Sequence, residues 1–331
     1  MTSNSEQKAP TTTSVMVGHA SQLGNRLLQG GTIAALIVLV LFFFLMRPDV
    51  FLSFVNVRNI LYQVSILAII AGAQTVVMVV GDFDLSVGAT SALAGATAAA
   101  CMLGGMPIPA AIALGVLVGA LIGLINGVFV AYLNLQPFIV TLAVMTSVIG
   151  LAFIVTQGTT LFNFPPEFNE LGQGRLFEIP LPVYFAVAIC LILWLVLRYT
   201  RLGREWHAIG GSVEVSRLSG INVQRSRMLA FVIAGFVSAI GGILLAARLG
   251  SASAVQGEDN MMFSVAAVFL GMTVIRSGAA NLGGTIIGVV IIGVMSNGLN
   301  ILGVNGYVQQ VVTGIIIIAA VTLSSLKHRE R

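Results

Sequence analysis

Long apolar runs separated by short polar segments dominate the sequence. They lie near residues 32–46, 59–80, 85–101, 109–133, 137–157, 180–197, 228–247, 261–275, 280–302 and 306–326. A helix that spans a bilayer needs about 20 apolar residues, and most of these runs reach that length. The pattern predicts about ten transmembrane helices, of which those at 85–101 and 261–275 are short.

Composition excludes a soluble globular protein. Of the 331 residues, 57% are hydrophobic and only 8% are charged, whereas soluble domains carry about 25% charged residues. A transmembrane barrel would show alternation in segments of about ten residues, and runs such as GTIIGVVIIGVM do not alternate. The 37 glycines favour close helix packing in lipid. We therefore expect an all-α integral membrane protein.

The basic residues predict an orientation, because cytoplasmic segments of membrane proteins are enriched in Lys and Arg. With the N-terminus inside, all but four of the 16 basic residues fall on the inner side. The four outer ones are Arg47, Arg58, Arg175 and Arg248. An even number of spans then places both termini in the cytoplasm.

The chain divides into three parts. We expect residues 1–30 to form a polar, flexible cytoplasmic tail, 31–326 the membrane domain, and 327–331 a basic C-terminal end. The first apolar run is interpreted as a retained helix rather than a signal peptide, because no small-residue cleavage site follows it.

The two halves of the membrane domain show a faint repeat. The pair Asn-Gly at 126–127 recurs at 297–298, and Asn134 recurs as Asn305 at the same spacing. GDFDLSV precedes the first short run, and GEDNMMFSV precedes the second. Five helices separate the halves, so matched segments would cross the membrane in opposite directions. This pattern favours a 5+5 inverted repeat with a transport pathway near the short helices.

Asp82 and Asp84 stand between two apolar runs, where a charge at the bilayer centre costs about 2.5–3.5 kcal/mol. In one interpretation both lie at the inner interface, and Asp84 caps the helix that begins with DLSVG. In the other, the chain break dips into the membrane and the Asp-Leu-Ser turn lines or gates a solute path. The two interpretations are compatible.

Uncharged polar residues recur within the apolar runs. They suit a path for a neutral polyhydroxylated solute, although such groups also serve as contacts between helices. An ion path would more often carry intramembrane charge. The candidate pathway residues are Asp82, Asp84, Ser86, Asn126, Asn134, Asn297 and Asn300.

The inner loop 198–227 is long and rich in arginine. Glycines at 203, 210, 211 and 220 bound what looks like a short amphipathic helix around 212–219. Loops of this length are usually functional or disordered. The pattern favours docking of a soluble partner, and the alternative is a segment that serves only as an orientation signal.

Sequence features of an enzyme are missing. There is no G-x-x-x-x-G-K-[ST] phosphate-binding motif and no recognisable nucleophile motif. His19, His207 and His328 are scattered, and Cys101 and Cys190 lie in apolar runs without the spacing of a disulfide framework or metal site. We expect no catalytic residue, cofactor, metal or nucleic-acid partner.

Long motifs carry a family resemblance. GDFDLSVGATSALAGATAA, TRLGREWHAIGGSVEVSRLSGINV, ARLGSASAVQGEDNMMFSVAAVFLGMT and LGGTIIGVVIIGVMSNGLNILGV are found in this order. From about residue 50 to 326 the chain resembles the permease subunits of bacterial ABC importers for ribose, xylose, arabinose and related monosaccharides.

The resemblance implies a multi-pass protein of the bacterial inner membrane, surrounded by lipid and paired with a second permease subunit, identical or different. A separate cytoplasmic ATPase would hydrolyse ATP and bind the 198–227 loop, and a periplasmic sugar-binding protein would deliver the solute. Glu214 and Arg217 would face the ATPase. The implied coupling residues are Gly211, Ser212, Glu214, Arg217 and Gly220, and the four outer arginines are candidates to meet the binding protein.

Two departures leave the substrate open. Asp82 stands where the family usually has glycine, and Arg276 lies in a stretch that is more often glycine-rich. Pentoses, hexoses, deoxyhexoses, furanose sugars and autoinducer-2 all remain candidates. The alternative functions are a stand-alone secondary transporter or channel, and an ABC permease for a nucleoside or an amino acid.

Overall fold

The computed structural model describes residues 34–274 and 278–329, so Lys8, Arg26, Arg276 and Arg331 lie outside the described residues. The chain begins there with a helix at Ala34–Met46. It continues with α2 (Pro48–Phe51), α3 (Phe54–Val79), α4 (Val87–Leu103), α5 (Ile108–Ala131), α6 (Pro137–Thr156), α7 (Pro166–Gln173), β1 (Arg175–Leu176), β2 (Ile179–Pro180), α8 (Leu181–Tyr199), α9 (Arg201–Gly211), α10 (Val213–Leu218), α11 (Val223–Leu249), α12 (Glu258–Val274), α13 (Leu282–Ile301) and α14 (Gly306–Arg329).

Each predicted apolar run lies on a helix. Within the described residues, α3, α5, α6, α8, α11 and α13 are long and apolar enough to span a membrane, while α4 and Ala34–Met46 are shorter apolar helices. The all-α membrane class is therefore confirmed. The count of about ten spans, the side on which the termini lie and the inverted repeat stay predictions.

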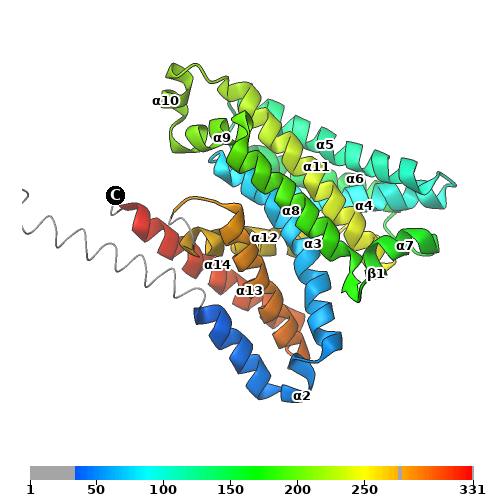
Figure 1. Cartoon of the computed structure of the whole chain (residues 1–331). Helices are drawn as coiled ribbons and strands as arrows, with labels where there is room; N and C mark the ends of the chain where they lie inside the picture. The colour runs from blue at the N-terminus through cyan, green and yellow to red at the C-terminus, as the bar shows by residue number, and fades with distance from the viewer. Residues whose placement is uncertain (1–33, 275–277, 330–331) are drawn as a thin grey trace, which may run out of the picture.

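Helix α11 packs against α3, α4 and α5 through glycine contacts, and Figure 1 shows it running alongside α5. A Cβ on Gly235 would collide with the carbonyl oxygen of Gly119, and one on Gly242 would collide with that of Ser91. Helices in lipid gain no hydrophobic drive toward one another, so such close backbone contact supplies the packing energy instead.

A second group of helices consists of α12, α13 and α14, and α3 contacts it as well as α11 (Figure 1). Gly271 of α12 and Gly284 of α13 meet backbone to backbone. The N-terminal helix joins this group, because the Phe43 ring lies against Gly298 of α13.

The short helices α4 and α12 begin beside each other. A Cβ on Gly257, just before α12, would collide with the carbonyl oxygen of Gly88 in the first turn of α4. The adjacent Ser91 packs on Gly242, which lies about two turns, or about 10 Å, before α11 ends at Leu249. Both short helices therefore start within the bundle rather than at its end.

Between α6 and α8 the chain forms α7 and the small antiparallel pair β1–β2, in which Arg175 pairs with Pro180. Gly172 of α7 lies against the backbone of Arg248 at the end of α11. A further bridge joins Leu161 to Ala252. This segment therefore covers the end of α11 from which the chain leads to α12.

Replacing Gly242 with alanine tests the glycine packing. We expect Gly242→Ala to destabilise the chain by about 1–3 kcal/mol, because the added methyl group meets the backbone of Ser91. Gly150→Ala in α6 is the matched control, since a Cβ there has open space. The thermal midpoint in detergent and the abundance in membranes should fall for the first variant only. Equal behaviour of the two variants would contradict the packing described.

Candidate functional site

The break between α3 and α4 brings together three of the predicted pathway residues. The backbone N–H and the Oγ of Ser86 donate to Asp84 Oδ1 at 2.8 and 2.6 Å. From α5, Asn126 Nδ2 donates to Ser86 Oγ at 2.8 Å and to Asp84 Oδ1 at 3.5 Å. All three side chains are buried. Asp84, Ser86 and Asn126 thus form one hydrogen-bonded cluster inside the bundle.

Asp84 caps the turn that leads into α4. Ser86 occupies the N-cap position but makes no side-chain cap bond, and Asp84 instead accepts from its backbone N–H two residues on, which is the geometry of an Asx turn. The turn starts at Gly81, whose φ of 93° suits glycine. Asp84 thus stabilises the chain break before α4, and its part in lining or gating a solute path stays a prediction.

Asp82 faces a different partner. Arg227, near the start of α11, donates to both carboxylate oxygens of Asp82, through Nε at 2.9 Å and Nη2 at 2.7 Å. The side chains are only 6% and 16% exposed for Asp82 and Arg227 respectively. Such a bidentate pair fixes orientation as well as charge. The sequence reasoning counted Arg227 only as an inner basic residue and missed this contact.

Helix α9 is packed onto the same end of α3. Gly210 lies against the carbonyl of Val79, two residues before Gly81. Trp206 is fully buried and its Nε1 donates to the Ser226 carbonyl at 2.8 Å. The amphipathic character of α9, which the sequence reasoning did not single out, fixes it against α3 and the start of α11.

A second contact joins α9 to α11. Ser226 Oγ donates to Glu205, and Arg201 Nε donates to the same carboxylate at 2.9 Å. The hydrogen bond from Ser226, followed by the contribution of Arg201, holds the pKa of Glu205 below its usual value against the opposing effect of burial. Glu205 is therefore ionised at neutral pH.

Helix α10 stands where a short helix was predicted around 212–219, and it projects from the bundle (Figure 1). Ser212 is its N-cap and accepts from the Val215 N–H at 3.3 Å. Gly220 ends it with a φ of 79°, and a Cβ on Gly211 would meet open space. Ser212 and Gly220 thus set the limits of the helix.

Helix α10 exposes both its apolar and its charged side chains. Glu214 and Arg217 are exposed, and that they face an ATPase stays a prediction. Val213, Val215 and Leu218 are also 41%, 62% and 80% exposed. An exposed apolar patch rimmed by charge is typical of an interaction surface. These three apolar residues were absent from the predicted set.

The remaining pathway candidates lie apart from the cluster at Asp84. Asn297 of α13 exchanges two hydrogen bonds with Asn56 of α3, at 2.9 and 3.0 Å. Asn300 accepts from Gln309 Nε2 at 2.8 Å. Asn134 is exposed in the turn after α5 with a φ of 53°. Helix–helix contacts and a turn account for these positions, and their part in a pathway stays a prediction.

The four arginines predicted to lie on the outer side separate into two pairs. Arg58 lies 3.8 Å from Glu178 and over the Phe54 ring, and Arg248 lies over the Tyr62 ring. Arg47 and Arg175 are exposed, and no ion pair involves them within the described residues. Contact of any of the four arginines with a binding protein stays a prediction.

The ion pair between Asp82 and Arg227 can be tested by a double-mutant cycle. We expect Arg227→Met to destabilise the chain by about 3–5 kcal/mol, because it leaves the buried Asp82 carboxylate unpaired. Adding Asp82→Ala should recover part of that loss, measured as the thermal midpoint in detergent. Arg225→Met, at an exposed position of the same helix, is the control. Strictly additive effects would exclude the coupling.

Comparison with known proteins identifies the family. The model described as "Branched-chain amino acid transport system / permease component" matches residues 56–321. The ribose import permease protein RbsC of Haemophilus influenzae is 37% identical over 91% of this chain and 94% of its own length. The Bacillus subtilis ribose permease is 40% identical over 90% and 92% of the two chains. The D-allose transport system permease protein AlsC of Escherichia coli is 36% identical over 89% of this chain and 91% of its own length. No solved structure matches. The chain belongs to this family of transport-system permeases.

Proposed function

We propose that this chain is the transmembrane permease subunit of an ATP-binding cassette importer that moves a monosaccharide or a sugar-like solute across the bacterial inner membrane. The observation that carries the proposal is the projecting helix α10, which is joined through α9 to the helix break at Asp84. The exposed surface of α10 is thus connected through packed helices to the buried turn at Asp84, so that movement of a bound partner could reach this turn.

The relatives favour sugar as the cargo. Their names specify ribose, D-allose, galactose or methyl galactoside, and L-arabinose, whereas the family description names branched-chain amino acids. The relatives are 33–37% identical over most of this chain. An amino-acid permease is therefore the second candidate, and uptake assays with both classes of solute separate the two.

The energy of ATP hydrolysis would be transmitted to this chain through α10. The sequence has no phosphate-binding loop of its own, so ATP would be hydrolysed on a cytoplasmic partner that binds the exposed face formed by Val213, Glu214, Val215, Arg217 and Leu218. The chain itself would have no catalytic residue.

Contacts between α9, the end of α3 and the start of α11 support a path of coupling. Gly210 of α9 touches the backbone at Val79 and Gly81. The next residue, Asp82, is held by Arg227, and Asp84 lies two positions further on. A displacement of α9 would therefore reach the turn at Asp84 through backbone contact and an ion pair, without a flexible linker between them.

Other partners follow from the same assignment. A periplasmic sugar-binding protein would meet the outer surface, where Arg47 and Arg175 are the exposed candidates. A second permease subunit, identical or different, would complete the pathway within the lipid bilayer.

The role of Asp84 can be divided into capping and charge. Asp84→Asn keeps an oxygen that accepts from the Ser86 N–H, whereas Asp84→Ala removes it. If capping alone matters, uptake should stay near the wild-type level with asparagine and fall with alanine. Equal loss in both variants, at normal membrane abundance, would show that the charge is required.

The α10 surface can be tested by affinity purification of the tagged chain from native membranes. We expect a stoichiometric ATPase subunit to accompany the wild type, identified by mass spectrometry. Replacing Val215 and Leu218 with serine, or Glu214 and Arg217 with alanine, should lower its recovery and the uptake of ribose, allose, galactose and arabinose by about tenfold.

The control for that experiment is Leu135→Ser, which changes an exposed apolar residue of a different turn. This variant should keep both the ATPase and the uptake. An α10 variant that retains the ATPase and transports normally would contradict the coupling role, and a wild-type chain that repeatedly purifies intact and alone would contradict the importer.

A further inference from the structure

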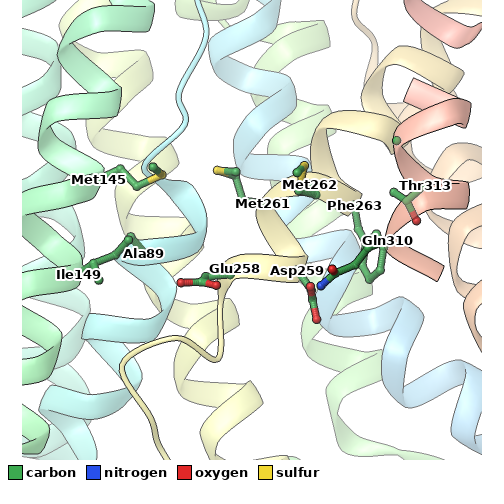
Figure 2. Close-up of a pocket in the computed structure, with 11 residues that line it drawn as sticks. Ala89, Met145, Ile149, Glu258, Asp259, Met261, Met262, Phe263, Gln310 and Thr313 are labelled. Carbon is green, nitrogen blue, oxygen red and sulfur yellow. The ribbon is translucent and has the colours of Figure 1, made fainter. Parts of the chain in front are cut away.

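Two cavities flank the first two turns of α12. One has a volume of about 300 Å³ and is lined by residues of α4, α6, α12 and α14 (Figure 2). The other has a volume of about 190 Å³ and is lined by residues of α3, α11, α12 and α13. Asp259 and Phe263 line both. The start of α12 is therefore a wall that the two cavities share.

The larger cavity combines polar and apolar groups. Figure 2 shows the Glu258 carboxylate directed toward Ala89 and Ile149, with Gln310 and Phe263 on the other side beyond Asp259. A carboxylate accepts hydrogen bonds from hydroxyl groups, and an amide both donates and accepts them. An aromatic ring offers an apolar face to the C–H side of a sugar ring. The lining suits a neutral polyhydroxylated molecule.

The smaller cavity contains an unused donor. Gln63, Gln256 and Ser296 line it together with Asp259. Gln256 Oε1 accepts from the Ser253 N–H at 3.1 Å, but its Nε2 is buried and has no hydrogen-bond partner. Buried polar atoms are normally paired, so an unpaired one at a cavity wall indicates a position for a ligand or a water molecule.

Neither carboxylate at the start of α12, that of Glu258 or that of Asp259, forms an ion pair among the residues that the structure describes, although Arg248 lines the smaller cavity together with Asp259. Their place in the first turn of α12 is favourable because of the helix dipole. This interaction leaves their carboxylate oxygens available to a molecule in the cavities. Both residues are exposed, so their carboxylates lie at the open side of cavities that begin about 10 Å short of the end of α11.

We propose that the first two turns of α12 form the sugar-contacting segment of the pathway, with Asp259 and Phe263 touching the solute and Gln256 and Gln310 as further hydrogen-bonding groups. This rests on the proposed function as a sugar permease. The Gly88–Gly257 contact joins the start of α12 to the start of α4, so the segment adjoins the helix that follows the Asp84 turn. None of these four residues was among the predicted pathway residues.

The test uses the complete importer, with the ATPase and the binding protein, and the panel of ribose, allose, galactose and arabinose. Asp259→Ala and Phe263→Leu should each lower the initial uptake rate by about tenfold, the effect of one lost contact to a substrate. Asp259→Asn should lie between, because it keeps one acceptor. The variants should also change the relative rates for the four sugars, which a purely structural defect would not do.

Asp49→Asn on α2 is the control, since it removes an exposed carboxylate remote from both cavities. Membrane abundance and ATP hydrolysis are measured in parallel, and Asp259→Asn and Phe263→Leu decide the matter where Asp259→Ala fails to accumulate. An active wild type with variants that match the control in rate and sugar preference would overturn this inference alone. A complete importer that moves none of the four sugars would overturn the proposed function and this inference with it.

Discussion

The structure depends on the close backbone approach of α11 to α4 and α5. Gly242 lies on Ser91, Gly235 on Gly119 and Gly123 on the carbonyl of Phe231, so no larger residue fits at these points. In lipid this contact replaces the hydrophobic drive of a soluble core. The contact between Gly242 and Ser91 also fixes the position of the first turns of α4 along α11. The polar turn at Asp84 is consequently enclosed by helices, and Asn126 of α5 reaches it from the side.

The end of the bundle at α9 is built as a single unit around the start of α11. Trp206 and Glu205 of α9 contact Ser226, and the next residue, Arg227, holds Asp82. Helix α11, which packs against α4 and α5, therefore provides both Ser226, which contacts α9, and Arg227, which pairs with Asp82 in the break between α3 and α4. A buried ion pair is weak evidence for added stability, and its geometry here favours a role in fixing the relative position of α3 and α11.

Periodicity and hydropathy predicted the apolar helices but not α2, α7 or α9. The DLSVG stretch predicted a helix cap at Asp84, whereas Ser86 is the N-cap and Asp84 accepts from its N–H in an Asx turn. Periodicity and hydropathy could not show the pairing of Asp82 with Arg227, which are 145 positions apart, or that of Asn297 with Asn56, 241 apart. Such contacts depend on how helices are arranged in space. The stretch GEDNMMFSV resembles GDFDLSV in sequence, but only the packing of α12 among its neighbours shows that Asp259 faces two cavities.

In the proposed function, transport requires energy from ATP that a partner subunit hydrolyses. This requirement is tested most directly by reconstituting the chain in liposomes, alone and with its ATPase and binding protein, and by measuring accumulation of labelled sugar. The account predicts accumulation above the external concentration only when all the components and ATP are present. Sugar movement by the chain alone, down its gradient or driven by an ion gradient, would contradict it.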